Sequence, residues 1–445
     1  MWHICSNIKL KFLAMFAIIL LNGNISVAED IDYIDITNPF LNKMPIAIPY
    51  FKALNGTADE KKMVKSTADL LSKTLEFSSF FKTMDRGAFL EEPAEKGITL
   101  KEVEFKNWTA IGAELLITGG IRDAGQGRME YELRLFDTFK ANMLVGKKYI
   151  STIDDQQIVT RRFCGEVLKQ LTGHRGVYDC KIAFISTTSG YKEIYIADFD
   201  GQNPVQFTSH RSITLFPAWS KDGNWLAYTS YYKNKPDIYI RNIRDKRLVT
   251  IKERGMQITP TWSPVQSELA ATLSYQGDQE IYLLTGNGKV IKRLTNSRDI
   301  DVEPTWSPDG KKIAFVSRRS GSPQIYMSDI KSGLVERLTY EGKYNTQPSW
   351  SPKGDKIVYS TMEKNEINIF TISVKDKKRI RLTEDSGYNE SPSWSPDGNL
   401  IVFSSNREGP SRIYVMTSFG TDQRRLLSMP GEQTNPRWSP SGIYR

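Results

Sequence analysis

The fold is decided by the stretch Pro304-Thr305-Trp306-Ser307-Pro308-Asp309-Gly310-Lys311-Lys312-Ile313-Ala314-Phe315, because its opening Pro-x-Trp-Ser recurs along the second part of the chain. The six tryptophans of this motif are Trp219, Trp262, Trp306, Trp350, Trp394 and Trp438. Consecutive tryptophans are 43 or 44 residues apart. A fixed period of roughly 20–50 residues is typical of repeat architectures. The second part of the chain is therefore one structural unit, repeated.

Each unit has the composition of four short β-strands joined by tight turns. Ser307-Pro308-Asp309-Gly310 predicts a reversal in which the glycine takes positive φ without steric cost. A strand-like run follows, then an Ile-aromatic pair such as Ile325-Tyr326, then a short element that ends at a threonine such as Thr339. Helical repeats are excluded, because the units lack helical spacing of apolar residues. Four strands per unit predict one blade of a β-propeller.

The two ends of the repeat region predict six blades. The run 181–186 begins a unit without its own Pro-x-Trp-Ser, and the last such motif, 436–439, has almost nothing after it. Five units are complete, so these two fragments supply the sixth, and we expect the C-terminal strand to close the ring. An equivalent large residue in every unit indicates packing between blades, so we interpret the tryptophans as core and not as a binding ladder.

The part before the repeats predicts a small α/β domain over residues 29–172, a linker at 173–180 and the propeller over 181–445. Thr57 and Glu60 have capping-box spacing at the start of a helix whose apolar residues keep helical period. Segments 114–121 and 128–139 alternate like strands, and Gly173 ends a second helix. Its core face is expected to contain Ile158, Cys164, Val167, Leu168 and Leu171.

The first 28 residues match a secretory signal peptide. Lys9 and Lys11 precede an apolar run over 12–21, and small residues lead to Ala28. We expect cleavage between Ala28 and Glu29, because the apolar run is too short to span a membrane. The mature chain is thus predicted to be exported and not membrane-spanning.

Export leaves two cysteines, Cys164 and Cys180, in an oxidising compartment. A disulfide between them is permitted but not required, because the sequence does not fix their separation. With only three His and three Cys in 445 residues, a zinc cluster is nearly excluded, and we expect no metal and no cofactor. The net charge of +9 is spread without a dense Lys/Arg run, and together with export this argues against nucleic acid as a partner.

Catalytic motifs are absent from the sequence. It has no Gly-x-Ser-x-Gly elbow, no P-loop and no Gly-x-Gly-x-x-Gly. The mature chain keeps only His174 and His210, and a lone histidine at a domain link or in a loop is more often structural than catalytic. We therefore predict that the protein is not an enzyme. One alternative stays open: a pair of carboxylates inside the propeller channel could act on envelope glycans or peptides.

Two candidate partner-binding regions follow from this organisation. The first is the propeller rim, where the connections into each innermost strand differ from unit to unit while the tryptophan stays constant. Its predicted residues are Thr214, Thr259, Asp301, Glu303, Tyr344, Gln347, Tyr388, Ser391 and Asn435. The second is an acidic N-terminal arm over 29–40. Its predicted contact residues are Glu29, Asp30, Ile31, Tyr33 and Ile34.

The whole mature chain resembles the TolB family of Gram-negative bacteria. The matching features are the signal peptide, the small α/β domain, the repeats typified by residues 304–315, and an end soon after the last Trp-Ser-Pro. The resemblance implies a periplasmic component of the Tol-Pal system that binds the lipoprotein Pal through the propeller and TolA through the N-terminal arm. It implies a role in outer-membrane integrity and in invagination during cell division. We expect a monomer.

Overall fold

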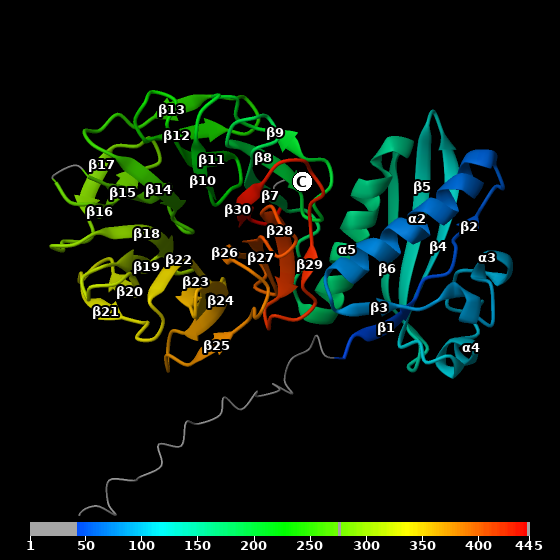
Figure 1. The fold of residues 1–445 in the computed structure, drawn as a ribbon. Helices are drawn as coiled ribbons and strands as arrows, with labels where there is room; N and C mark the ends of the chain where they lie inside the picture. Colours follow the sequence, from blue (N-terminus) through cyan, green and yellow to red (C-terminus); the bar gives the residue numbers. More distant parts are fainter. Residues whose placement is uncertain (1–41, 275–276, 443–445) are drawn as a thin grey trace, which may run out of the picture. The chain divides into compact units, whose positions relative to one another are not determined.

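The structure is a computed structural model that describes residues 42–274 and 277–442. These residues form an α/β domain followed by six four-stranded sheets (Figure 1). The predicted signal peptide, its cleavage between Ala28 and Glu29, and the contact residues of the N-terminal arm lie outside the described residues. They stay predictions.

The α/β domain is built on one mixed sheet with strand order β3-β1-β4-β5-β6, and β2 pairs with the far part of β4. Strand β1 is parallel to β3 and β4, whereas β4, β5 and β6 are antiparallel to one another. The strands are β1 Met44–Ala47, β2 Lys52–Ala53, β3 Phe81–Thr83, β4 Leu115–Gly125, β5 Arg128–Asp137 and β6 Asn142–Thr152. The helices are α2 Ala58–Phe77, α3 Pro93–Lys96, α4 Phe105–Ala110 and α5 Gln156–Thr172, with 3₁₀ turns at Arg86–Ala88 and Ile153–Asp155.

Helix α2 begins, and helix α5 ends, where the sequence predicts. The Thr57 side chain accepts a hydrogen bond from the Glu60 amide at 3.3 Å and caps α2, and Gly173 ends α5 with φ of 84°. The expected core position of Ile158 is wrong, because its side chain is 47% exposed. Its neighbour Val159 is buried instead, so the apolar stripe of α5 starts one residue later.

The propeller consists of six antiparallel sheets, each a four-stranded meander with one strand on the central channel (Figure 1). The sheets are given in chain order, each from its innermost strand outward. The first two are β10 Thr214–Trp219, β11 Trp225–Ser230, β12 Asp237–Asn242, β13 Leu248–Thr250; and β14 Gln257–Trp262, β15 Glu268–Leu273, β16 Glu280–Thr285, β17 Val290–Arg293. The next three are β18 Asp301–Trp306, β19 Lys312–Ser317, β20 Gln324–Asp329, β21 Val335–Arg337; β22 Tyr344–Trp350, β23 Lys356–Glu363, β24 Glu366–Ser373, β25 Arg379–Arg381; and β26 Asn389–Trp394, β27 Leu400–Ser405, β28 Arg412–Thr417, β29 Arg424–Arg425. The sixth is β30 Gln433–Trp438, β7 Lys181–Ser186, β8 Glu193–Asp198, β9 Val205–Gln206.

The C-terminal strand closes the ring, as predicted. Strand β30 pairs with β7, so that Gln433 lies opposite Ser186 and Trp438 opposite Ile182. The sixth blade therefore takes its innermost strand from the end of the chain and its other three strands from the start of the repeat region. Because of this closure, the innermost strand of every blade is paired with a neighbouring strand.

The motif tryptophans pack between blades, which confirms their predicted structural role. Trp262, for example, lies in one apolar cluster with Ile240 and Ile251 of the preceding blade and with Leu269 of its own. The other five occupy equivalent clusters. All six side chains are at most 9% exposed, so each blade is fixed to its neighbour by the same large residue.

The α/β domain shares a continuous apolar core with the sixth blade and with the neighbouring blade of β26–β29. Phe77 of α2 packs edge-to-face on Phe199, with ring centroids 4.9 Å apart. The Arg424 guanidinium donates to the Phe77 carbonyl at 2.5 Å, and the Ser79 hydroxyl donates to the Asp422 carboxylate at 2.6 Å. The residues from 42 onward accordingly form one compact unit.

Candidate binding site in the central channel

A β-bulge interrupts every innermost strand of the propeller just before the motif proline. The pairing register shifts there in all six blades. The residue before each proline has φ between 50° and 56°, unusual for a non-glycine residue. These residues, which we call the bulge ring, are Phe216, Thr259, Glu303, Gln347, Ser391 and Asn435. Because proline has no N–H for the ladder, the bulge accommodates it and re-aims the preceding side chain.

Hydrogen bonds run around part of the bulge ring from one blade to the next. The Gln347 amide N–H donates to Glu303 Oε2 at 2.7 Å, and the Ser391 amide N–H donates to Gln347 Oε1 at 2.7 Å. Asn435 Nδ2 donates to the Ser391 hydroxyl at 2.9 Å. Four neighbouring blades are thereby linked at the channel wall.

A second ring of channel residues lies two positions further along each strand, directly before the motif tryptophan. It consists of Ala218, Thr261, Thr305, Ser349, Ser393 and Arg437. Five of these side chains are small, and Arg437 is the exception. Its Nη1 donates to two backbone carbonyls, Pro436 at 3.0 Å and Ser391 at 3.3 Å.

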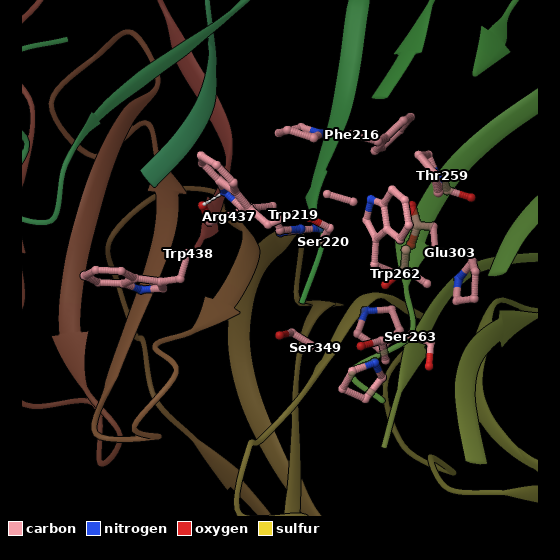
Figure 2. Close-up of a pocket in the computed structure, with 18 of the residues that line it drawn as sticks. Phe216, Trp219, Ser220, Thr259, Trp262, Ser263, Glu303, Ser349, Arg437 and Trp438 are labelled. Atoms are coloured by element: carbon pink, nitrogen blue, oxygen red, sulfur yellow. Dashed lines mark hydrogen bonds between the residues drawn. The ribbon is translucent and has the colours of Figure 1, made fainter. Parts of the chain in front are cut away.

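Ten of the twelve residues of the two rings, all but Ser391 and Ser393, line a cavity of about 280 Å³ (Figure 2). Its walls combine motif prolines and tryptophans with the hydroxyls of Thr259, Thr261 and Ser349. Glu303 and Arg437 both line it. Burial raises the pKa of Glu303, an effect that the Gln347 amide and the positive charge of Arg437 reduce. Burial lowers the pKa of Arg437 to about 10, partly countered by Glu303.

The structure divides the predicted rim residues into three groups. Five of them belong to the bulge ring: Thr259, Glu303, Gln347, Ser391 and Asn435. All of these except Ser391 line the cavity. Tyr344 is the first residue of β22 and Tyr388 directly precedes β26, and the two side chains are 51% and 48% exposed. Thr214 and Asp301 are fully buried within their blades, and Asp301 is paired with Arg319 at 2.6 Å, so neither lies on an exposed rim.

Two channel residues escaped the sequence prediction, Phe216 and Arg437. The predicted set contains Thr214, three residues before the motif proline, whereas Phe216, directly before that proline, lines the cavity. Counting back one residue from each proline would have found Phe216. Counting back one residue from each tryptophan would have found Arg437.

The remaining chemistry-bearing residues are structural in the part of the chain that the structure describes. Cys164 and Cys180 are free, buried thiols, so the disulfide left open by the sequence is not formed. His210 Nδ1 lies 2.7 Å from the Ser230 hydroxyl, and its ring packs against Tyr228 and Tyr239. No cluster of three or more His, Cys, Asp or Glu side chains arranged for a metal occurs among residues 42–274 and 277–442. No helix within those ranges has the length and apolar composition needed to cross a membrane.

Comparison with known protein families assigns both domains. A model of the TolB β-propeller domain matches residues 168–442, and a model of the TolB amino-terminal domain matches residues 32–144. The chain belongs to the TolB family. The resemblance predicted from the repeats is confirmed.

Relatives of this TolB-family chain include the Tol-Pal system protein TolB of Desulfosudis oleivorans, 56% identical over 266 residues, and a protein TolB homolog of Chlorobaculum tepidum, 40% identical over 269 residues. Each match covers 60% of this chain and 60% of the relative. The crystal structure of TolB from Acinetobacter baumannii superposes with a TM-score of 0.78 at 26% identity, over 90% of this chain and 97% of that one. The arrangement of a small α/β domain and a propeller is thus that of TolB proteins.

Proposed function

We propose that this chain is a periplasmic protein-binding scaffold of the Tol-Pal system, which binds Pal through the propeller and TolA through the N-terminal arm. In this role it supports outer-membrane integrity and invagination during cell division. Membership of the TolB family is the main support, since relatives carry the name Tol-Pal system protein. Cleavage after Ala28 would deliver the mature chain to the periplasm, and N-terminal sequencing of the exported protein should begin at Glu29.

The observation that carries the propeller part of this proposal is the pair of tyrosines Tyr344 and Tyr388. They occupy equivalent positions on neighbouring blades, and both are about half exposed beside strands that enter the channel. Large aromatic side chains that combine an apolar ring with a polar hydroxyl are enriched in the energetic centres of protein interfaces. We propose this end of the propeller as the Pal-binding face.

A scaffold role also agrees with the chemistry of the channel. A glycosidase of the alternative hypothesis needs two carboxyl groups that flank the scissile bond, roughly 5–9.5 Å apart. Among the described residues that line the cavity, Glu303 is the one carboxylate. The acid–base pair that this alternative requires has no second member there, and we favour binding without turnover.

The test compares the affinity of the purified, unmodified protein for Pal with the affinities of its Tyr344→Ala and Tyr388→Ala variants. We expect each substitution to weaken binding by about tenfold or more, as for an interface hot spot. The matched control is Leu334→Ala, because Leu334 is 76% exposed but lies in the turn between β20 and β21, at the opposite end of its blade. Unchanged Pal affinity in both tyrosine variants would contradict this face.

The arm part of the proposal is tested separately by pull-down from solubilised envelopes. Protein that begins at Glu29 should retain both Pal and TolA, whereas protein that begins at Pro39 should retain Pal alone. Recovery of TolA with the shortened protein would contradict the role proposed for Glu29, Asp30, Ile31, Tyr33 and Ile34.

A further inference from the structure

Two opposite charges face the channel cavity from opposite walls. Glu303 belongs to β18 and Arg437 to β30. The innermost strands contact one another in the cyclic order β10, β14, β18, β22, β26, β30, so β18 and β30 are three blades apart in a ring of six. Figure 2 draws the two side chains on either side of the cavity.

Neither charge is required by the repeat. The other five bulge-ring positions carry Phe, Thr, Gln, Ser and Asn, and the other five positions of the second ring carry Ala, Thr, Thr, Ser and Ser. Blades with neutral residues at these positions form the same bulge and the same interblade packing. A charged residue is therefore not needed at either position for the bulge or for the packing between blades.

Both groups keep unused hydrogen-bonding capacity toward the cavity. Within the described residues Arg437 uses Nη1 only, and its Nε and Nη2 have no partner. Glu303 Oε2 accepts from the Gln347 amide, while no described residue donates to Oε1. The described part of the chain contains no ion pair between the two side chains within 4.0 Å. Each charge is therefore available to a molecule placed between them.

The size and lining of the cavity restrict that molecule. A volume of about 280 Å³ lies just below the range of roughly 300–1,000 Å³ that is usual for sites of drug-sized ligands. Prolines and tryptophans supply apolar walls, and a few polar groups converge on the space. This combination is typical of a site for a small molecule held by a small number of directed contacts.

We propose that the cavity binds a small zwitterion of amino-acid or dipeptide size, with its carboxylate on Arg437 and its ammonium group on Glu303. The planar guanidinium offers paired N–H donors that match a carboxylate, and an ammonium group donates to the free carboxylate oxygen. A zwitterion satisfies both walls at once without adding net charge to a partly desolvated space. The inference goes beyond the proposed scaffold function and uses different residues.

Burial supports this assignment energetically. Burial raises the pKa of the Glu303 carboxyl and lowers that of the Arg437 guanidinium, which means that desolvation at the cavity wall disfavours both charged forms. A ligand of complementary charge at each end would remove part of this penalty. A ligand with only one charged end would leave the other group uncompensated.

The experiment is calorimetric titration of the purified protein with the dipeptide alanylalanine, its N-acetyl form and its C-terminal amide. We expect the free dipeptide to bind at least about tenfold more tightly than either blocked form, since each block removes one charge-assisted contact. Glu303→Gln, which copies the neighbouring blade, should abolish the preference for a free amino group and keep the preference for a free carboxylate. Arg437→Ser, which copies Ser349 and Ser393, should give the reverse.

Thermal unfolding of each variant checks that the propeller is intact, and Glu408→Gln is the control, because Glu408 is half exposed and outside the cavity lining. This control should bind all three dipeptides as the unmodified protein does.

Equal binding of the free and blocked dipeptides, or no binding by the unmodified protein at millimolar concentration, would overturn the proposal. Inorganic phosphate binding as tightly as alanylalanine would also overturn it, by showing an anion site on Arg437 alone. None of these outcomes would affect the tests of Pal and TolA binding.

Discussion

The indole Nε1 of Trp219 donates a hydrogen bond to the backbone carbonyl of Arg437 at 3.2 Å, although the two residues lie 218 positions apart. Trp306 and Trp394 make the same bond to Thr261 and Ser349 in their preceding blades, also at 3.2 Å. The bond from Trp219 differs because it joins the first complete blade to the C-terminal strand. It is part of what holds the ring shut.

This hydrogen bond predicts that replacing a motif tryptophan with phenylalanine lowers the free energy of unfolding by different amounts at Trp219 and at Trp262. Trp219→Phe keeps most of the packing but removes the hydrogen bond, whereas the buried Nε1 of Trp262 has no partner among the described residues. We expect Trp219→Phe to lower the free energy of unfolding by about 1 kcal/mol more than Trp262→Phe does. Urea denaturation of the two variants measures the difference. Equal losses would show that the closing bond contributes nothing to stability.

A second prediction concerns the buried carboxylate of Glu60 at the start of α2. Its two oxygens accept hydrogen bonds from the amides of Asn55 and Gly56 at 2.8 Å and of Asp123 at 2.7 Å. Glu60→Gln would turn an amide NH₂ toward backbone donors, so we expect a loss of about 2 kcal/mol in the free energy of unfolding. Glu102→Gln is the control. Glu102 also accepts backbone N–H bonds, from Ile98 and Thr99, but at an exposed site where water can replace them.

The third prediction is a pH dependence that originates at Glu303. Burial raises its pKa in the folded protein, so the ionised carboxyl destabilises the folded state at neutral pH. Glu303→Gln should therefore raise the free energy of unfolding at pH 7. This gain should shrink as the pH falls through the raised pKa and disappear below the ordinary glutamate value of 4.5. Denaturation between pH 3 and 8 follows the difference, and a gain that grows toward acid pH would have the wrong sign.

Adding Arg437→Ser tests whether the two channel groups interact. Without the positive charge, the pKa of Glu303 should rise further, because Arg437 lowers it in the unmodified protein. Glu303→Gln should then stabilise the Arg437→Ser protein more than it stabilises the unmodified one at pH 7. An identical gain in both backgrounds would indicate no coupling across the channel.

The fourth prediction concerns the free thiols. Burial raises the pKa of Cys164 and of Cys180 well above the ordinary value, so little reactive thiolate is present in the folded state. We expect iodoacetamide to modify neither cysteine in the native protein at pH 7.5 and both after unfolding without a reductant. Mass spectrometry of tryptic peptides locates the label. A peptide that links Cys164 to Cys180 would show instead that the two are bridged in the exported protein.

The repeat architecture follows from the amino-acid sequence alone. A tryptophan every 43 or 44 residues, flanked by proline and by turn residues such as Asp309-Gly310, specifies local strands and reversals that any similar chain would form. The incomplete units at the two ends were enough to predict closure by the last strand. The capped start of α2 and the glycine that ends α5 were likewise local features, set by side chains within a few residues of the backbone groups they satisfy.

Which side chains share the channel depends on how the blades assemble. The bulge before each proline shifts the strand register, and in the first complete blade the residue that lines the cavity is Phe216 and not the predicted Thr214. Glu303 and Arg437 are far apart in the chain, and they face one cavity only because six blades form a closed ring. Local chemistry fixes each blade, but the meeting of side chains from opposite blades depends on the number of blades and on closure, which are properties of the assembled ring.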